Sequence, residues 1–264
     1  MPMSCIEATR HPLLHRIAQG ADWTLEDEFP SCREWADEHE LWLRFVDGKG
    51  ELNRFFPRLK KSAFQRDRTL SEIGIASFLE MHCSLPIMEW EPDGEAGRKG
   101  EFLVNTPHGT IFVEVKTGGW QKDIVEAEGK NSPRLSQPKY VQAEARSVAP
   151  WAVIRNAVGN AYPKFPASMP TLLVIRDDYF IALNDALNPA IALYCESDGY
   201  GGEKGYFQDH RYERLGAVGL LEVRLMSDKV TYDFALFDNP NAISTVKIPQ
   251  SVFNGYPRRN SAEE

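Results

Sequence analysis

Residues 100–117 read GEFLVNTPHGTIFVEVKT. Two runs rich in β-branched and aromatic residues flank the turn-forming segment 105–109, a pattern that predicts a β-hairpin. With the turn centred between Pro107 and His108, Glu101 is predicted to lie directly across from Glu114. Hairpins with this register place opposed side chains on the same face of the sheet.

The predicted hairpin brings three charged side chains together. Side chains of a strand alternate between its two faces, so Lys116 is expected to share the face of Glu114. Opposed carboxylates, about 5 Å apart at their β-carbons, repel each other unless a cation lies between them. Mg²⁺ or Mn²⁺ suits two carboxylates, waters and a substrate phosphate oxygen. The pattern predicts a metal site on Glu101 and Glu114, with Lys116 beside it to orient water or neutralise developing charge.

A second interpretation of Glu114-x-Lys116 needs no metal. The same letters are typical of a half-exposed strand with a solvated face. Two observations favour the functional interpretation: the opposed Glu101, and the crossover expected to follow. In that crossover a strand over 110–117, a helix over 150–162 and a buried apolar strand over 171–176 form a parallel pair.

The rest of the chain predicts one α/β domain with a mixed β-sheet flanked by helices. Apolar residues at helical spacing predict a helical N-terminal extension over 1–69 and a further helix over 70–83. The core motif region is expected over 70–176, additional strands and helices over 177–256, and a loose tail over 257–264. A hairpin over 217–225 and 230–237 is expected to extend the sheet.

Glu72 is the third candidate carboxylate. A helical wheel places it within the arc of apolar residues, where a buried carboxylate needs a partner such as a metal or its water shell. The alternative is a capping box over Thr69-Leu70-Ser71-Glu72, in which Glu72 bonds back to the Thr69 amide. Glu80, on the flank of the stripe, is the weaker substitute.

A helix bearing an acid, strands bearing an acid and then Glu-x-Lys, a helix and a buried strand together resemble the PD-(D/E)xK superfamily of restriction-endonuclease-like proteins. The likeness covers residues 70–176, and its motif is short. It implies a restriction-endonuclease-like core, with Glu101 and Glu114 as metal ligands, Lys116 as catalytic lysine and Glu72 as the helix acid. The family usually has Pro-Asp where this chain has Gly100-Glu101, and a literal Pro-Asp occurs earlier, at Asp93. Glu101 is preferred because the register places it opposite Glu114.

Composition limits the partners of the chain. A net charge of −8 over 264 residues counts against nucleic acid, although basic residues gather locally. No run is apolar enough to cross a bilayer and no secretory signal is visible, so cytoplasm is the expected compartment. Four scattered cysteines predict neither a zinc knuckle nor disulfides. The candidate nucleic-acid-binding residues are Arg54, Arg58, Lys60, Lys61, Lys122, Lys130, Arg134 and Lys139.

Two functions from different classes remain open at this stage. The first is a metal-dependent nuclease acting on nucleic acid, with DNA as the expected substrate and a homodimer if both strands of a duplex are cut. The second is a catalytically inactive protein of the same fold that acts as a binding module through its acidic N-terminal helices. Fold-level analogy alone separates neither these functions nor DNA from RNA.

Overall fold

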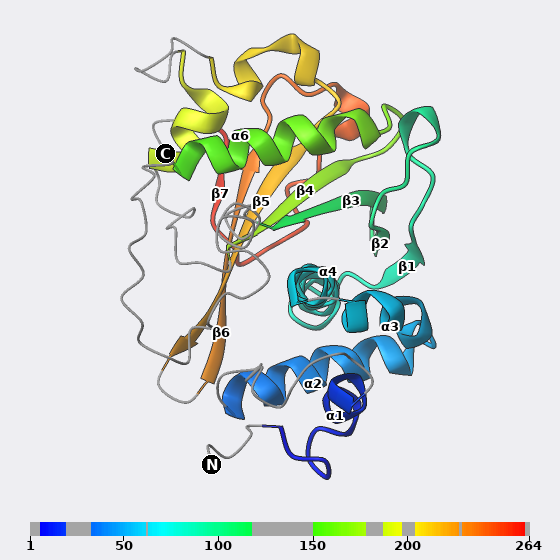
Figure 1. Ribbon diagram of the computed structural model, residues 1–264. Coiled ribbons are helices and arrows are strands. Elements are labelled where there is room, and N and C mark those ends of the chain that lie inside the picture. The colour runs from blue at the N-terminus through cyan, green and yellow to red at the C-terminus, as the bar shows by residue number, and fades with distance from the viewer. Residues whose placement is uncertain are drawn as a thin grey trace. The chain divides into compact units, whose positions relative to one another are not determined.

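A computed structural model describes residues 6–19, 33–61, 63–117, 150–177, 187–196, 204–226 and 229–261 (Figure 1). Contacts within the chain divide it into two compact units. The helical unit comprises Met1–Ser77, Gly119–Ser147 and Arg224–Thr231, and the sheet unit comprises Phe78–Gly118, Val148–Val223 and Tyr232–Glu264. The helical unit thus contains the whole N-terminal extension predicted over 1–69 and the first residues of the core motif region predicted over 70–176.

The helical unit is formed by α1 (Pro12–Gln19), α2 (Arg33–Gly48), α3 (Leu52–Lys61) and most of α4 (Ala63–Met81). Its core includes Trp42 and Phe55, both fully buried. Gly74 allows close packing here, because a Cβ at this position would lie 3.1 Å from the Trp42 ring. The prediction of a helical N-terminal region is confirmed.

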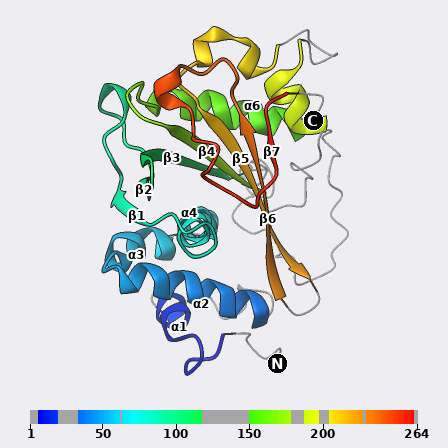
Figure 2. The same cartoon turned by 180° about the vertical axis from the view of Figure 1, so that it is seen from behind.

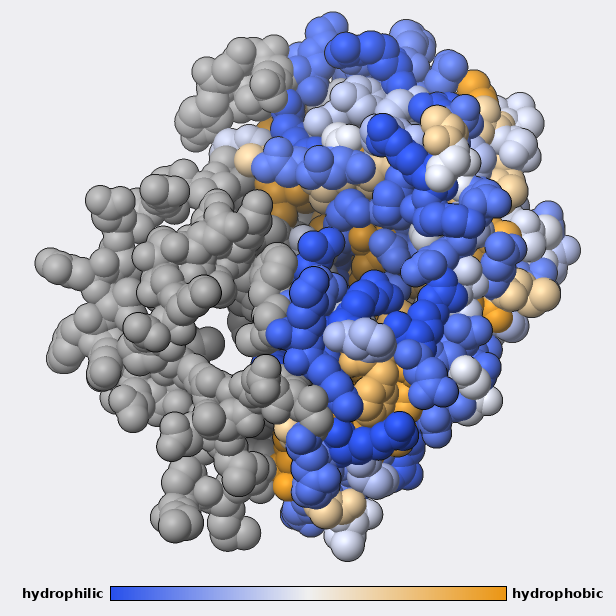
Figure 3. Space-filling view, turned by 45° about the vertical axis from the view of Figure 1, so that its right-hand side comes forward, coloured by the Kyte–Doolittle hydropathy of each residue, from blue (hydrophilic) through white to orange (hydrophobic). Residues whose placement is uncertain are grey.

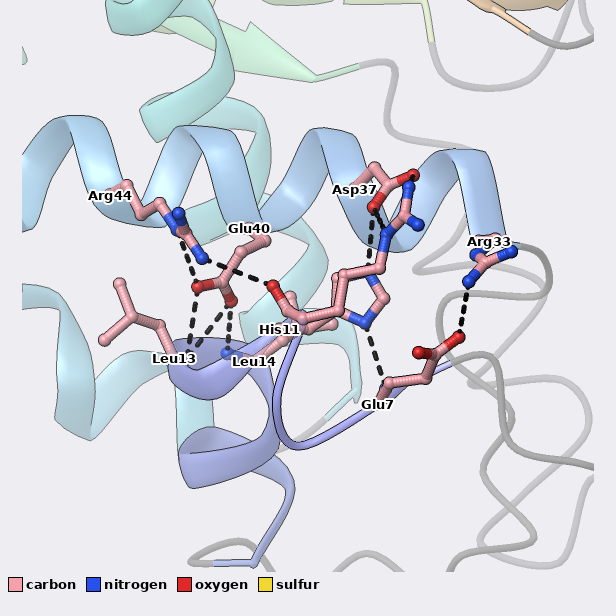
Figure 4. A network of polar contacts seen from close by, with 9 residues as sticks. Glu7, His11, Leu13, Leu14, Arg33, Asp37, Glu40 and Arg44 are labelled. Carbon is pink, nitrogen blue, oxygen red and sulfur yellow. Dashed lines mark hydrogen bonds and ion pairs between the residues drawn. The ribbon is translucent and has the colours of Figure 1, made fainter.

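A buried carboxylate holds the first turn of α1 against α2 (Figure 4). Glu40, 3% exposed, accepts hydrogen bonds from the backbone N–H groups of Leu13 and Leu14 at 3.1 and 3.0 Å. N–H groups in the first turn of a helix have no acceptor within that helix, so Glu40 supplies one. The negative charge of Glu40 also interacts favourably with the positive end of the helix dipole. Arg44 donates to the same carboxylate at 3.0 Å and balances its charge.

Asp37 joins the loop before α1 to α2. The Arg10 guanidinium hydrogen-bonds its carboxylate and is the main reason that the pKa of Asp37 lies below the usual 3.8, with a smaller contribution from His11. Because folding lowers this pKa, the contact stabilises the helical unit at neutral pH, and its contribution is lost progressively as the pH falls below 3.8.

The described residues form a sheet of seven strands in the order β1-β2-β3-β4-β5-β6-β7. Their bounds are β1 Ile87–Trp90, β2 Phe102–Thr106, β3 Gly109–Thr117, β4 Thr171–Asp177, β5 Ala217–Met226, β6 Lys229–Asp238 and β7 Arg258–Arg259. β1, β2 and β3 pair antiparallel, whereas β3 with β4 and β4 with β5 pair parallel. The predicted mixed sheet of an α/β fold is therefore confirmed.

Helix α6 (Pro150–Ala161) lies along the sheet and contacts β3 and β4 (Figure 1). The predicted stripe of Ile154, Ala157, Val158 and Ala161 is buried. A parallel β3–β4 pair requires such a crossover, and the buried stripe supplies its packing face. The predicted crossover is confirmed, and it returns the chain to the sheet through residues 162–170.

Short helical segments complete the described chain. They are η1 Glu95–Gly97, η3 Tyr162–Lys164, α7 Leu187–Pro189, η4 Ala190–Tyr194, η5 Tyr206–Gln208, η6 His210–Tyr212 and η7 Ser244–Val246. From behind, Figure 2 shows β7 beside the end of β6.

The C-terminal segment differs from the loose tail expected over 257–264. Arg258 and Arg259 form β7, which pairs parallel with β6. The Arg258 guanidinium forms an ion pair with Asp238 and also donates to the backbone oxygen of Ile248 at 2.7 Å. These contacts order two residues whose polar character suggested no structure.

Apolar surface is limited on the face seen in Figure 3, where the coloured residues are mainly hydrophilic and the apolar ones form separate small patches. Within the described ranges, no helix is both long and apolar enough to span a membrane.

Candidate active site

The β2–β3 hairpin has the predicted register. Phe102 pairs with Val113, and the pairing continues to Thr106 with Gly109 at the turn. Glu101 directly precedes β2, and its N–H donates to the Val113 oxygen at 3.1 Å. The described pairing ends at Phe102 with Val113, so the predicted pair of Glu101 and Glu114 lies one position beyond the paired strands.

Glu114 is the most buried charged group of the site, with a side chain that is 0% exposed. One carboxylate oxygen, Oε1, accepts hydrogen bonds from the ammonium groups of both Lys116 and Lys164, the latter at 2.6 Å. The other oxygen, Oε2, is buried and accepts no hydrogen bond from any residue that the structure describes. A buried carboxylate oxygen without a hydrogen-bond donor lowers stability, because burial removes its hydrogen bonds to water and nothing replaces them.

Lys164 is a functional candidate that the sequence analysis missed. It ends η3, just after α6, and its ammonium lies 2.6 Å from Glu114 Oε1 and 3.9 Å from Glu101 Oε1. A cation between the two carboxylates was predicted, and in this structure that cation is a lysine. The one sequence feature that could have pointed to Lys164 is that it is the only charged residue between Arg155 and Arg176.

The backbone of Lys164 is held firmly. The loop before β2 approaches it so closely that a Cβ at Gly94 would lie 2.4 Å from the Lys164 oxygen, so only glycine fits. On the other side, Arg214 donates to the Phe165 oxygen at 3.0 Å and lies over the Tyr162 ring at 4.9 Å. The backbone that carries the Lys164 side chain is therefore fixed by the fold.

Glu72 has a partner that neither earlier interpretation named. Its carboxylate accepts two hydrogen bonds from Arg58, at 2.8 and 3.0 Å, within the helical unit. The capping-box interpretation is wrong, because α4 begins at Ala63 and Thr69 lies inside the helix, where its hydroxyl donates to the Gln65 oxygen. A bidentate pair with a guanidinium is the geometry that satisfies a buried carboxylate best.

The two substitute acids are occupied elsewhere. Asp93 is 81% exposed and pairs with Lys99 across an isolated bridge in the loop before β2. Glu80 accepts a hydrogen bond from the Ile87 N–H at 2.9 Å and so fixes the start of β1. Glu101, unlike these two acids, faces the same Lys164 ammonium as Glu114.

The predicted basic surface is described only in part. Lys122, Lys130, Arg134 and Lys139 lie outside the described residues. On α3, Arg54 pairs with Glu51 at 3.6 Å and Arg58 pairs with Glu72. The Lys60 ammonium lies 4.3 Å from the centroid of the Phe56 ring, and Lys61 is exposed. Arg66, from the same basic run of the sequence, is only 4% exposed, and burial lowers its pKa. It therefore offers no surface charge, whereas Lys60 and Lys61 do.

The donor set of the hairpin fits a hard divalent cation. Mg²⁺ is commonly held by one or two carboxylates, with waters and substrate oxygens completing its shell. Glu101 and Glu114 supply two carboxylates, and Glu114 Oε2 is a buried acceptor in need of a partner. Among the described side chains, no group of three or more His, Cys, Asp or Glu residues is arranged to hold a metal. An ion held by these two carboxylates would take its remaining ligands from water and substrate.

Cys83 and His82 do not form a nucleophilic pair. Burial raises the pKa of the Cys83 thiol to about 12, so the thiolate is not available at neutral pH. The His82 ring stacks on Phe78, with centroids 5.7 Å apart, and packs against Tyr232. His82 is exposed and Cys83 is half-buried, just after the end of α4.

Comparisons with known proteins add little to this geometry. No family model matches the sequence, and no curated protein matches it either. Among solved structures, the chain is similar to SfsA of Pyrococcus furiosus in complex with Ca²⁺, with 13% identity and a TM-score of 0.32. The match covers 62% of this chain and 62% of that one, less than two thirds of either.

Proposed function

We propose that this chain is a metal-dependent nuclease with a PD-(D/E)xK type of site, which hydrolyses phosphodiester bonds in DNA. The observation that supports the proposal is the buried Glu114, which contacts Lys116 and faces the Lys164 ammonium together with Glu101. This arrangement follows the motif that first suggested the family. Mg²⁺ or Mn²⁺ is the proposed cofactor, and a homodimer and a cytoplasmic location belong to the same proposal.

Each residue has a distinct role in the proposed site. Glu101 and Glu114 would hold the ion, which when bound supplies Lewis acidity and lowers the pKa of water. Lys116, with a side chain that is 18% exposed, keeps its ammonium at the edge of the buried pair. From there it can orient the attacking water and neutralise charge that develops on the phosphate. Glu72 is the proposed helix acid of the motif, and its carboxylate pairs with Arg58 within the helical unit.

A second candidate function is a non-catalytic binding module on the same fold. The observation that favours it is Lys164, because an ammonium that already contacts both carboxylates can make the cluster a structural ion-pair network. Buried networks of this kind occur without any catalytic role. The two candidates differ in whether the chain cleaves nucleic acid when a divalent ion is present.

Cleavage by the full-length protein tests the proposal most directly. Supercoiled plasmid, linear duplex, single-stranded DNA and RNA are incubated with the chain in Mg²⁺, in Mn²⁺ and with a chelator. We expect DNA cleavage that requires the metal and stops when it is removed. Absence of cleavage of every substrate, together with no shift of melting temperature by either metal, would contradict the nuclease and favour the binding module.

Reversal of two charges on α3 tests the proposed DNA surface. Lys60→Glu with Lys61→Glu should weaken DNA binding about 10-fold or more and flatten its dependence on salt, because phosphate contacts release counterions. Fluorescence anisotropy with a labelled duplex at several salt concentrations measures both effects. The matched control is Lys247→Glu, an exposed lysine of the sheet unit whose ammonium donates to the Pro240 oxygen. Unchanged affinity in the double variant would place the DNA contact elsewhere.

A further inference from the structure

The ammonium of Lys164 occupies the position that a shared cation would take. It contacts Glu114 Oε1 at 2.6 Å and lies 3.9 Å from Glu101 Oε1, so it faces both carboxylates at once. Lys116 also contacts Glu114 Oε1. The two lysines therefore converge on one oxygen of a carboxylate whose other oxygen is buried and receives no hydrogen bond from the described residues.

Among the described residues, the charges of Glu101, Glu114, Lys116 and Lys164 cancel without a metal. Two carboxylates contribute −2 and two ammonium groups contribute +2, which gives a net formal charge of zero. A neutral cluster has little attraction for a phosphate group. Addition of a divalent ion makes the cluster positive, which is the condition under which an anionic substrate binds. The same addition places a like charge close to Lys164, and this repulsion opposes metal binding.

We propose that Lys164 is a built-in counter-cation of the Glu101–Glu114 pair, which holds the carboxylates together without metal and competes with the divalent ion for them. The proposal rests on the proposed metal-dependent function and names the residue that regulates it. Metal binding then requires the Lys164 ammonium to withdraw from Glu114, while its backbone stays fixed by the contacts at Gly94 and Phe165. Lys164 is a positioning residue, because it acts on the ligands rather than on the substrate.

Removal of the ammonium should have opposite effects on metal affinity and on metal-free stability. Lys164→Gln is expected to bind Mn²⁺ at least about 10-fold more tightly than the native chain, because a like charge has left the site. Without metal the same variant should melt at a lower temperature, because Glu114 loses a partner. Saturating Mn²⁺ should therefore raise its melting temperature by more than it raises that of the native chain. A residue with only a structural role would lower stability without tightening metal binding.

Isothermal titration of the full-length chain with Mn²⁺ alone, and melting curves over a range of Mn²⁺ concentrations, measure these effects. Lys99→Gln is the matched control, because it removes a lysine of the same unit that pairs with exposed Asp93, and its Mn²⁺ affinity should equal that of the native chain. Lys164→Arg keeps the charge and should bind Mn²⁺ no more tightly than the native chain. Lys164→Met, which keeps the aliphatic stem, replaces the glutamine variant if glutamine prevents folding.

The outcomes separate this inference from the proposed function. Native affinity or weaker in both Lys164→Gln and Lys164→Met overturns the role of Lys164 and leaves a metal-dependent nuclease intact. Tighter binding in these variants, in a protein that cleaves no nucleic acid, supports the role of Lys164 and overturns the nuclease. Absence of Mn²⁺ binding in the native chain and in every variant overturns both.

Discussion

Replacement of Glu114 by glutamine is expected to reduce metal-dependent DNA cleavage by about 1,000-fold or more, because the change removes a proposed metal ligand and a charge at once. Glu114 is 0% exposed, so the variant loses a fully buried negative charge. The shift of melting temperature with Mg²⁺ or Mn²⁺ should disappear together with activity. Cleavage assays and melting curves with and without metal measure the two effects on the same preparation.

The same substitution should also lower stability in the absence of metal. Lys116 and Lys164 both donate to Glu114 Oε1, and loss of this carboxylate takes one negative charge from beside two ammonium groups. Loss of one partner from a buried pair costs about 3 kcal/mol, and the partial exposure of both lysines reduces this figure. Urea unfolding of the metal-free protein measures the change.

Two carboxylate controls show whether the effect belongs to Glu114. Glu101→Gln should abolish metal-dependent stabilisation with a smaller loss of metal-free stability, because Glu101 is 21% exposed and lies 3.9 Å from Lys164. Glu89→Gln, on the exposed side of β1, should leave cleavage, metal response and stability unchanged. Retention of native cleavage by Glu114→Gln would remove this residue from the proposed mechanism.

The hairpin was predictable because its determinants are local. Alternation of side chains fixes which residues share a face, and the turn segment 105–109 fixes the register, so the pairing of Phe102 with Val113 was predictable from the sequence. The crossover through α6 was predictable for a related reason. A parallel pair needs a long connection, and an apolar stripe at helical spacing supplies it.

Lys164 was not predictable in this way. Its contact with Glu114 joins residues 50 positions apart and depends on the path by which the chain returns from α6 to β4. Neither periodicity nor a short motif encodes that path. The close approach of Gly94 to the Lys164 backbone helps to fix this path. The sequence shows that residue 94 is a glycine, but it does not show which backbone packs against it.

Two further differences arose where a local pattern competed with other interactions. Thr69 and Glu72 match a capping box, but the preceding residues continue the helix back to Ala63, so no helix end exists there to be capped. Arg258 lies in a polar segment, and its order comes from Asp238 on a strand formed 20 residues earlier. In both cases the structure depends on residues outside the short stretch that the motif covers.

Replacement of Lys116 by alanine is expected to separate catalysis from metal binding. Cleavage should fall by about 100-fold or more, because the proposed role of the ammonium is toward the attacking water and the phosphate. Mn²⁺ binding should be at least as tight as in the native chain, because the change removes a positive charge and leaves both carboxylates. Single-turnover cleavage and titration with Mn²⁺ measure the two properties, with the loss expected in the cleavage rate rather than in DNA affinity.

The combination of variants assigns each charge of the cluster. Loss of metal binding in Lys116→Ala would mean that the lysine holds Glu114 in place rather than acting on the substrate. Retained metal binding with lost cleavage would place it in catalysis, since Glu114→Gln is expected to lose both. Lys164→Gln differs again, because it should tighten metal binding while the proposed catalytic lysine remains. Three substitutions around one carboxylate oxygen therefore give three different patterns, and a purely structural ion-pair cluster would give none of them.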